Sequence, residues 1–291
     1  MTAFTPPGMA LETKTSTEPE FRLLMPSRAE NVSIVRQALG GMVDVLQLGD
    51  SRLLDINAAV SEACNNVVVH AYEGEEGPME VFLCVGEEEL EVIVSDEGTG
   101  IRPKRRDADR EIQGLGLALI QTLSDRVEFL GGIGDGTKVR MAFALDGRVS
   151  EEWIRDLPTS NPEVSPPPGE LNVAVSAGPL AAPMLGRVIA MLAARAGFSL
   201  DGISEAQLVT DSLAVHVPRV TLGEKIQLGI DRPENQLVVR VGPLEDGGAG
   251  RVLESSALGN LPPVLERLTS ERRVESSEDG ELLCLTLVNP H

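Results

Sequence analysis

The sequence predicts a two-layer α/β sandwich, in which a mixed β-sheet is covered by helices, and it predicts that this unit is repeated in tandem. Stretches with apolar residues at helical spacing occur beside short apolar runs of strand character. The strands are segregated from the helices, which favours a sheet layer under a helix layer. The same order of elements returns after a proline-rich stretch, which indicates an internal repeat.

The elements of the first half follow from periodicity and turn residues. Apolar positions at helical spacing predict a helix that starts at Ser27 and reaches Leu46, and a second helix over 53–70. Short apolar runs predict strands at 21–25, 79–85, 90–95, 127–130 and 137–144, and a third helix is expected at 117–123. These elements form a first unit over residues 21–147.

Three further segments complete the organisation of the chain. Residues 1–20 are rich in Thr, Pro and Glu, which predicts a disordered lead-in. Residues 148–170 are acidic and contain Pro166-Pro167-Pro168, which predicts a partly extended linker. The second unit is expected over residues 171–291.

The composition indicates a globular protein and excludes several functions. Of the residues, 42% are hydrophobic and 3% aromatic, so aliphatic side chains must form the core. A net charge of −20 repels phosphate backbones and argues against a nucleic-acid-binding protein. The Cys and His residues are scattered, which fits a reducing cytoplasm and predicts no metal cluster. Neither a signal peptide nor a membrane span is expected.

An acid and an amide lie one helical turn apart in the second predicted helix. Glu62 and Asn66 have the spacing that places both side chains on one helix face. Their neighbours are apolar or small, and a buried polar group is costly without a partner, so we expect this pair to have one. Taken alone, the same spacing is more typical of a solvated helix face.

Two glycine-containing motifs follow the acid–amide pair. Asp96-Glu97-Gly98-Thr99-Gly100 comes directly after an apolar strand, although this pattern alone usually indicates a surface turn. Gly114-Leu115-Gly116-Leu117 is expected to open a helix, whose N-terminal N–H groups suit an anion. The basic loop at 102–110 between them either contacts phosphate or solubilises the surface, and both interpretations stay open.

These three motifs, in this order, resemble the Bergerat nucleotide site of the GHKL ATPases, the superfamily of gyrase, histidine kinases and MutL. The resemblance implies a Bergerat fold that binds ATP with Mg²⁺. It implies that Asp96 accepts from the adenine amine, that Glu62 is the general base, and that Asn66 binds both nucleotide and metal. The other nucleotide-binding residues that it implies are Gly98, Gly100, Gly114, Leu115, Gly116, Leu117 and Thr137.

The stretch AVSEACNNVVVHAY, residues 59–72, looks most like the anti-sigma-factor serine/threonine kinases of the RsbW type. That family phosphorylates a serine on a STAS-domain anti-anti-sigma protein and binds a sigma factor, so the resemblance implies these partners and a bacterial regulatory role. Two alternatives stay open. One is a non-catalytic ATP-dependent module that sequesters a regulator, and the other is an ATPase without a protein substrate.

The second half is expected to have lost this site. In the repeat, Asp211 falls near Glu62 and Val215 near Asn66, while Pro243 stands where Asp96 would be. A degenerate pseudo-ATPase unit is therefore expected. Because RsbW-type kinases are homodimers, the resemblance implies that this unit packs on the first as an intrachain pseudo-dimer. A chance resemblance between two α/β units is the alternative.

Overall fold

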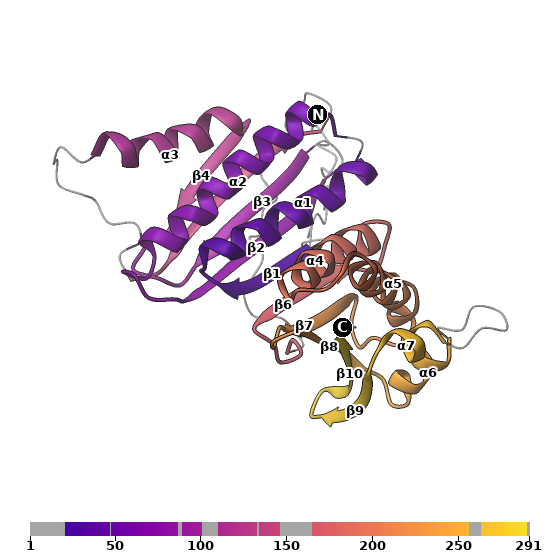
Figure 1. Cartoon of the computed structure of the whole chain (residues 1–291). Coiled ribbons are helices and arrows are strands. Elements are labelled where there is room, and N and C mark those ends of the chain that lie inside the picture. Colours follow the sequence, from indigo (N-terminus) through magenta and orange to yellow (C-terminus); the bar gives the residue numbers. More distant parts are fainter. Residues whose placement is uncertain are drawn as a thin grey trace, which may run out of the picture.

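The computed structural model describes residues 21–46, 48–86, 89–100, 110–132, 134–145, 165–255 and 263–289 (Figure 1). The first run of elements is β1 (Phe21–Pro26), the 3-10 helix η1 (Ala29–Asn31), α1 (Val32–Leu46), α2 (Asp50–His70), β2 (Pro78–Val85), β3 (Glu89–Asp96), α3 (Arg110–Leu123), β4 (Arg126–Leu130) and β5 (Thr137–Ala144). The second run is β6 (Leu171–Ser176), α4 (Ala181–Arg195), α5 (Leu200–His216), η2 (Val217–Arg219), β7 (Lys225–Asp231), β8 (Gln236–Leu244), α6 (Gly248–Ser255), α7 (Val264–Leu268), β9 (Glu271–Ser277) and β10 (Gly280–Val288). The expected lead-in at 1–20, most of the expected linker and all but the last residue of the basic loop lie outside the described residues.

All of these strands form one ten-stranded sheet, so the two-layer α/β class is confirmed. The strand order is β4-β5-β3-β2-β1-β6-β7-β8-β10-β9. α1 and α2 cover the strands of the first half, and α4 and α5 cover those of the second half on the same face (Figure 1). The site described below lies at the ends of these layers in the first half.

The sheet differs from the mixed sheet that we expected, because every pairing among the described strands is antiparallel. The course of the chain gives the reason. α3 returns the chain so that β4 runs in the same direction as β3, but β5 lies between these two strands. A parallel contact is thereby avoided, and the sheet is built from antiparallel neighbours only.

α2 carries the residues that matter most for the site. Its buried positions are Ile56, Ala59, Val60, Ala63, Cys64 and Val67, which confirms the helical spacing seen in the sequence. The opposite face is exposed, as Leu54 and Val69 show with exposed fractions of 67% and 62%. Such a helix lies on a sheet as one layer of a globular fold. Within the described residues, no helix has the length and apolar character that crossing a membrane requires.

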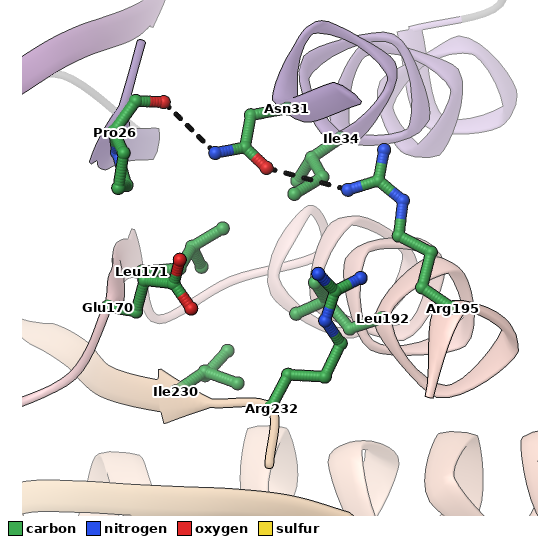
Figure 2. Close-up of a pocket in the computed structure, with 9 residues that line it drawn as sticks. All are labelled: Pro26, Asn31, Ile34, Glu170, Leu171, Leu192, Arg195, Ile230 and Arg232. Atoms are coloured by element: carbon green, nitrogen blue, oxygen red, sulfur yellow. Dashed lines mark hydrogen bonds between the residues drawn. The ribbon is translucent and has the colours of Figure 1, made fainter. Parts of the chain in front are cut away.

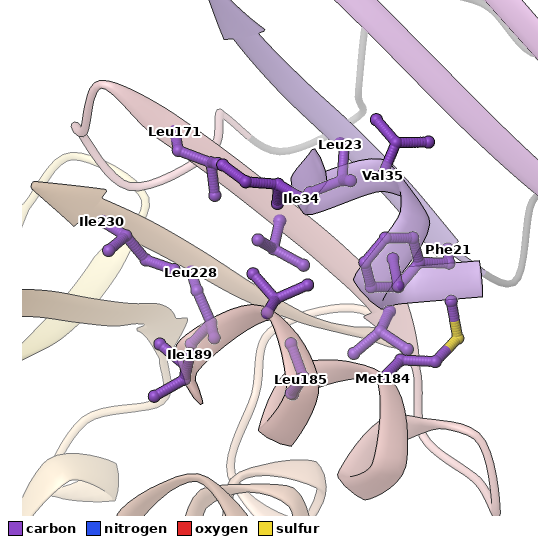
Figure 3. Packing of buried hydrophobic residues seen from close by; sticks show 14 of the residues in the cluster. Phe21, Leu23, Ile34, Val35, Leu171, Met184, Leu185, Ile189, Leu228 and Ile230 are labelled. Carbon is purple, nitrogen blue, oxygen red and sulfur yellow. The ribbon is translucent and has the colours of Figure 1, made fainter. Parts of the chain in front are cut away.

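β1 and β6 join the two halves at the centre of the sheet. They pair antiparallel, with Phe21 opposite Val175 and Leu24 opposite Asn172. α1 packs on α4 so closely that a methyl group at Gly41 would come within 2.6 Å of the Pro183 carbonyl oxygen. The core is continuous across this junction and includes the side chains labelled in Figure 3, which are Phe21, Leu23, Ile34, Val35, Leu171, Met184, Leu185, Ile189, Leu228 and Ile230.

The strand order of one half has the same form as that of the other. Counted outward from the junction, the first half runs β1-β2-β3-β5-β4 and the second half runs β6-β7-β8-β10-β9. Two helices follow the first strand in each half, and the second of them ends at a histidine, His70 in α2 and His216 in α5. These parallels allow a position-by-position comparison of the two halves.

Candidate functional site

The candidate site lies where the C-terminal part of α2 meets the end of β3, the start of β5 and helix α3. The order of strands brings the end of β3 next to the start of β5, with Asp96 directly opposite Thr137. α2 reaches the same place because the Thr99 N–H donates to the carbonyl oxygen of Ala71, which follows the helix, at 2.9 Å. Residues that are far apart in the sequence therefore meet at one end of the sheet.

Asp96 is the buried carboxylate of the site. Only 7% of its surface is exposed, and its Oδ1 accepts from the Gly98 N–H at 2.9 Å. Burial raises the pKa of Asp96, and hydrogen bonds from Gly98 and from the backbone and side chain of Thr137 oppose that rise. A carboxylate held in this way is a fixed acceptor that still has lone pairs for a ligand.

The glycines of the turns allow the backbone segments around Asp96 to pack closely. Gly100 has a φ of +72°, and a methyl group there would overlap the carbonyl oxygen of Gly132. Gly136 has a φ of +70°, and a methyl group there would overlap the carbonyl oxygen of Asp96 itself. Any other residue at these positions would have an unfavourable backbone conformation, and its Cβ atom would overlap a neighbouring carbonyl oxygen. The glycines therefore allow the loops around the carboxylate to adopt this arrangement.

Glu62 and Asn66 lie one turn apart on α2, as their spacing predicts. Both side chains are half-buried. The Asn66 Nδ2 atom is buried and, within the described part of the chain, has no hydrogen-bond partner. An unpaired buried N–H group costs free energy, so a partner for Asn66 Nδ2 is expected outside the described residues.

The Gly114–Leu117 motif is placed differently from our expectation. α3 begins at Arg110, so Gly114, Leu115, Gly116 and Leu117 lie inside the helix and not at its N-terminus. The residues from Arg110 to Gln113 are compatible with a helix, and the cost of an internal glycine, about 1 kcal/mol, is small beside tertiary packing. The expectation that these N–H groups form the helix N-terminus is therefore wrong for this structure.

Gly116 allows α3 to approach α2 closely. A methyl group at Gly116 would overlap the Glu62 Oε1 atom, so only glycine leaves room for the carboxylate there. Leu117, the next residue, is 46% exposed. Gly116 of the motif therefore lies directly against the Glu62 carboxylate of α2.

The residues that the structure brings together fit a nucleotide with its metal. Asp96 offers an acceptor for an exocyclic amine. The tightly packed glycine turns bring their backbone close to the Asp96 carboxylate. The unpartnered Asn66 Nδ2 can donate to an acceptor such as a phosphate oxygen, and the oxygen of the same amide is the kind of ligand that Mg²⁺ prefers. No cluster of three or more acidic, His or Cys side chains that would hold a metal by itself occurs among the described residues.

The equivalent place in the second half has different chemistry. In the pairing of β8 with β10, Leu244 lies opposite Glu281, as Asp96 lies opposite Thr137. The Glu281 carboxylate accepts from the N–H groups of Gly247 at 2.9 Å and Ala249 at 3.1 Å, and these bonds lower its pKa. The backbone donors at the start of α6 are thus bound by the protein's own carboxylate.

Helix α5 of the second half has neither the acid nor the amide at the positions that match those of α2. Because α2 and α5 end at equivalent histidines and share a pattern of buried positions, Glu62 corresponds to Leu208 and Asn66 to Ser212. These counterparts lie about one turn from the Asp211 and Val215 that we expected, and Leu244 replaces the expected Pro243. Leu208 can neither accept a proton nor bind a metal.

A small cavity lies apart from this site, at the junction of the halves. Its volume is about 20 Å³, which is room for one water, and Figure 2 shows residues of both halves around it. The Arg195 guanidinium, at the end of α4, lies beside it and donates to Asn31 Oδ1 at 3.5 Å. The cavity includes none of the site residues described above, and its contacts connect the halves.

Sequence reasoning gave Tyr72 no role at this site. Its hydroxyl accepts from the Glu97 N–H at 3.0 Å and donates to the Pro78 carbonyl oxygen at 2.5 Å. The available signal was that Tyr72 is the only tyrosine of the chain and lies two residues after the end of the acid–amide helix. Periodicity could not reveal it, because the contact joins segments that are distant in the sequence.

Comparisons with known proteins match the half of the chain that contains this site. The family described as "Histidine kinase-like ATPase domain" matches residues 25–143. The serine-protein kinase RsbW of Bacillus pumilus is 36% identical over 125 residues, which cover 38% of this chain and 77% of that protein. RsbW of Listeria monocytogenes is 35% identical over 150 residues, which cover 47% of this chain and 94% of that protein.

A solved structure is also similar in sequence over part of the chain. The histidine kinase domain of a blue-light activated histidine kinase from Erythrobacter litoralis is 21% identical, and the match covers 40% of this chain and 60% of that one. The TM-score is 0.29, at which the superposition supports no argument about the fold.

Proposed function

We propose that this chain, which belongs to the family of histidine-kinase-like ATPases that includes the serine-protein kinase RsbW, binds Mg-ATP in its first half and phosphorylates a serine or threonine of a partner protein. The family supports an ATP-binding regulatory kinase. The observation that carries the proposal for this chain is the meeting of α2 with the end of β3, which brings the unpartnered Asn66 amide and the buried Asp96 carboxylate to one site.

Each group has a defined part in nucleotide binding. Asp96 accepts a hydrogen bond from the exocyclic amine of adenine, and Thr137 holds that carboxylate in place through two hydrogen bonds. Asn66 provides a side-chain oxygen for Mg²⁺, which supplies charge neutralisation at the phosphates when it is bound. Because α3 contacts α2 at Gly116, the glycine-containing helix covers the same site.

Glu62 is the group that moves the proton in the proposed transfer. The hydroxyl oxygen of the acceptor side chain forms a bond to the γ-phosphorus, and the bond from that phosphorus to the bridging oxygen of ADP breaks. The hydroxyl proton passes to the Glu62 carboxylate, and ADP carries away the electron pair of the broken bond. Gly116 leaves the space in which this carboxylate lies.

The proposed protein substrate is a STAS-domain anti-anti-sigma protein, and a sigma factor is the proposed second partner. Support comes from the relatives, which are named serine-protein kinases of the RsbW type. Incubation with γ-labelled ATP, with and without such a STAS protein, separates three possibilities. Label on the STAS protein supports the kinase, release of free phosphate alone supports an ATPase, and ATP binding without either supports a non-catalytic binding module.

The second half is proposed to be a degenerate copy of the first that packs on it as an intrachain pseudo-dimer without a nucleotide. Support comes from the matching strand orders, the antiparallel β1–β6 pairing and the continuous core. Leu208 and Leu244, at the positions of Glu62 and Asp96, remove the base and the adenine acceptor. Such packing would give one nucleotide site in each chain.

Neighbouring glycines of α1 provide a matched test of this packing. Gly41→Ala would push a methyl group into the α4 backbone, whereas at Gly40 the nearest atom is the Arg187 Nη1 at 3.1 Å, at the end of a flexible side chain. We expect Gly41→Ala to lower the free energy of unfolding by about 1–3 kcal/mol, as overpacking does. Gly40→Ala should be neutral or stabilising. Equal effects of the two variants in urea denaturation would contradict the packing of the two halves.

A further inference from the structure

The segment that follows α2 packs against the turn that carries Asp96. The Ala71 carbonyl oxygen accepts from the Thr99 N–H, and a methyl group at Gly98 would overlap that same oxygen. Tyr72, the next residue, is half-buried, and a methyl group at Gly77 would overlap its ring. The ring is therefore packed closely against Gly77 of its own loop, and this contact restricts its orientation.

The Tyr72 hydroxyl joins two segments of backbone. It donates to the Pro78 carbonyl oxygen at 2.5 Å, at the start of β2, and accepts from the Glu97 N–H at 3.0 Å. Partial burial raises the pKa of Tyr72, the hydrogen bond from the Glu97 N–H opposes that rise, and the negative charges of Asp96 and Glu97 add to it. The phenol thus stays protonated at neutral pH and can make both hydrogen bonds at once.

We infer that Tyr72 is a positioning residue for the choice of nucleotide base, because its hydroxyl fixes the backbone of Glu97 and through it the direction of the Asp96 carboxylate. This inference rests on the proposed binding of ATP. Adenine presents an amine donor where guanine presents a carbonyl acceptor, and a carboxylate in a fixed place attracts the first and repels the second. Discrimination of this kind depends on exact placement of the polar group.

Tyr72→Phe tests the inference, since it keeps the ring and removes only the hydroxyl. We expect the affinity for ATP to fall about 3- to 10-fold, which corresponds to the net contribution of one hydrogen bond. The weaker affinity for GTP should change less. The ratio of the two affinities, measured by calorimetry on the full chain, should therefore fall. A hydroxyl that served only stability would leave this ratio unchanged.

Ser199→Ala is the matched control. It removes a hydroxyl of the second half that accepts from the Gly202 N–H at 3.1 Å and caps α5. Thermal unfolding should show a comparable or larger loss of stability in this control, with an unchanged ratio of ATP to GTP affinity. If the unmodified protein binds ATP and Tyr72→Phe keeps the ratio, the inference is overturned. If the unmodified protein binds neither nucleotide, the proposed function fails, and the inference fails with it.

Discussion

The ends of β3 and β8 occupy matching places in the two halves of the sheet but differ in what they hold. At β3, the buried Asp96 carboxylate is held by Thr137 and faces a site with an unpartnered amide. At β8, the matching residue is Leu244, and the carboxylate at this place belongs to Glu281, which lies opposite Leu244 in the sheet. There it binds the N–H groups at the start of α6.

The two halves thus share the order of their strands and helices and differ in the side chains at the ends of these elements. Strands and helices of both halves bury apolar side chains, because the sheet and the junction depend on them. Side chains at the ends of these elements contribute chemistry and little packing, so they change without loss of the fold. The following predictions test whether the two halves differ in function as they do in chemistry.

The largest effect is expected from Glu62→Gln. The variant keeps the size of the side chain but replaces one carboxylate oxygen with an NH₂ group that cannot accept the proton, so phosphoryl transfer should fall by roughly 10²- to 10⁴-fold with ATP affinity unchanged. Glu205→Gln on α5, in the second half, is the control and should have no effect. Single-turnover transfer with labelled ATP measures both variants, and an unchanged rate for Glu62→Gln would assign Glu62 a structural role only.

Asp96→Asn is expected to weaken ATP binding by about 1.5–3 kcal/mol, the range for a hydrogen bond to a charged group. It should not destabilise the ligand-free protein. Burial raises the folded-state pKa of Asp96 above its unfolded value, so the ionised form at neutral pH opposes folding, and the neutral amide removes that cost. Asp246→Asn, just beyond β8, is the control for calorimetry and urea unfolding. Equal ATP affinities for the two variants would argue against the site.

Gly116→Ala should lower the rate of phosphoryl transfer without lowering the stability of the protein. Alanine favours the helix, and the group that it displaces is the flexible Glu62 carboxylate, so the melting temperature should be unchanged or higher. Displacement of the base should lower the transfer rate by on the order of 10- to 100-fold. Gly250→Ala, in α6 with open space around it, should raise stability and keep activity. Full activity in Gly116→Ala would show that the contact with Glu62 is not needed.

The smallest effect is a dependence of ATP affinity on pH. Because burial raises the pKa of Asp96, its carboxylate takes up a proton at a higher pH than an ordinary aspartate does, and the protonated group is a weaker acceptor. Affinity should therefore fall on acidification, beginning above the usual aspartate range. The ATP phosphates also titrate, so the comparison is with Asp96→Asn, whose profile should be flatter. Identical profiles would remove Asp96 from the adenine contact.

Much of the fold could be predicted from the sequence because burial leaves a periodic pattern. The helix expected at 53–70 is observed at 50–70, and the strand before Asp96 ends at that residue, because apolar spacing and the glycine turn are local signals. The start of α3 at Arg110 was missed, since the packing of α3 on α2 outweighs the cost of two internal glycines. The hydrogen bonds of Tyr72 and Glu281 were not predicted, because they join segments that are distant in the sequence.

The central claim is that this chain has one nucleotide site, in its first half. Calorimetric titration of the full chain with Mg-ATP, repeated on Asp96→Asn, tests the claim most directly. We expect one ATP bound per chain in the unmodified protein, with the affinity of that single site weakened in the variant. Two ATP per chain, or one ATP whose affinity is unchanged in the variant, would contradict it.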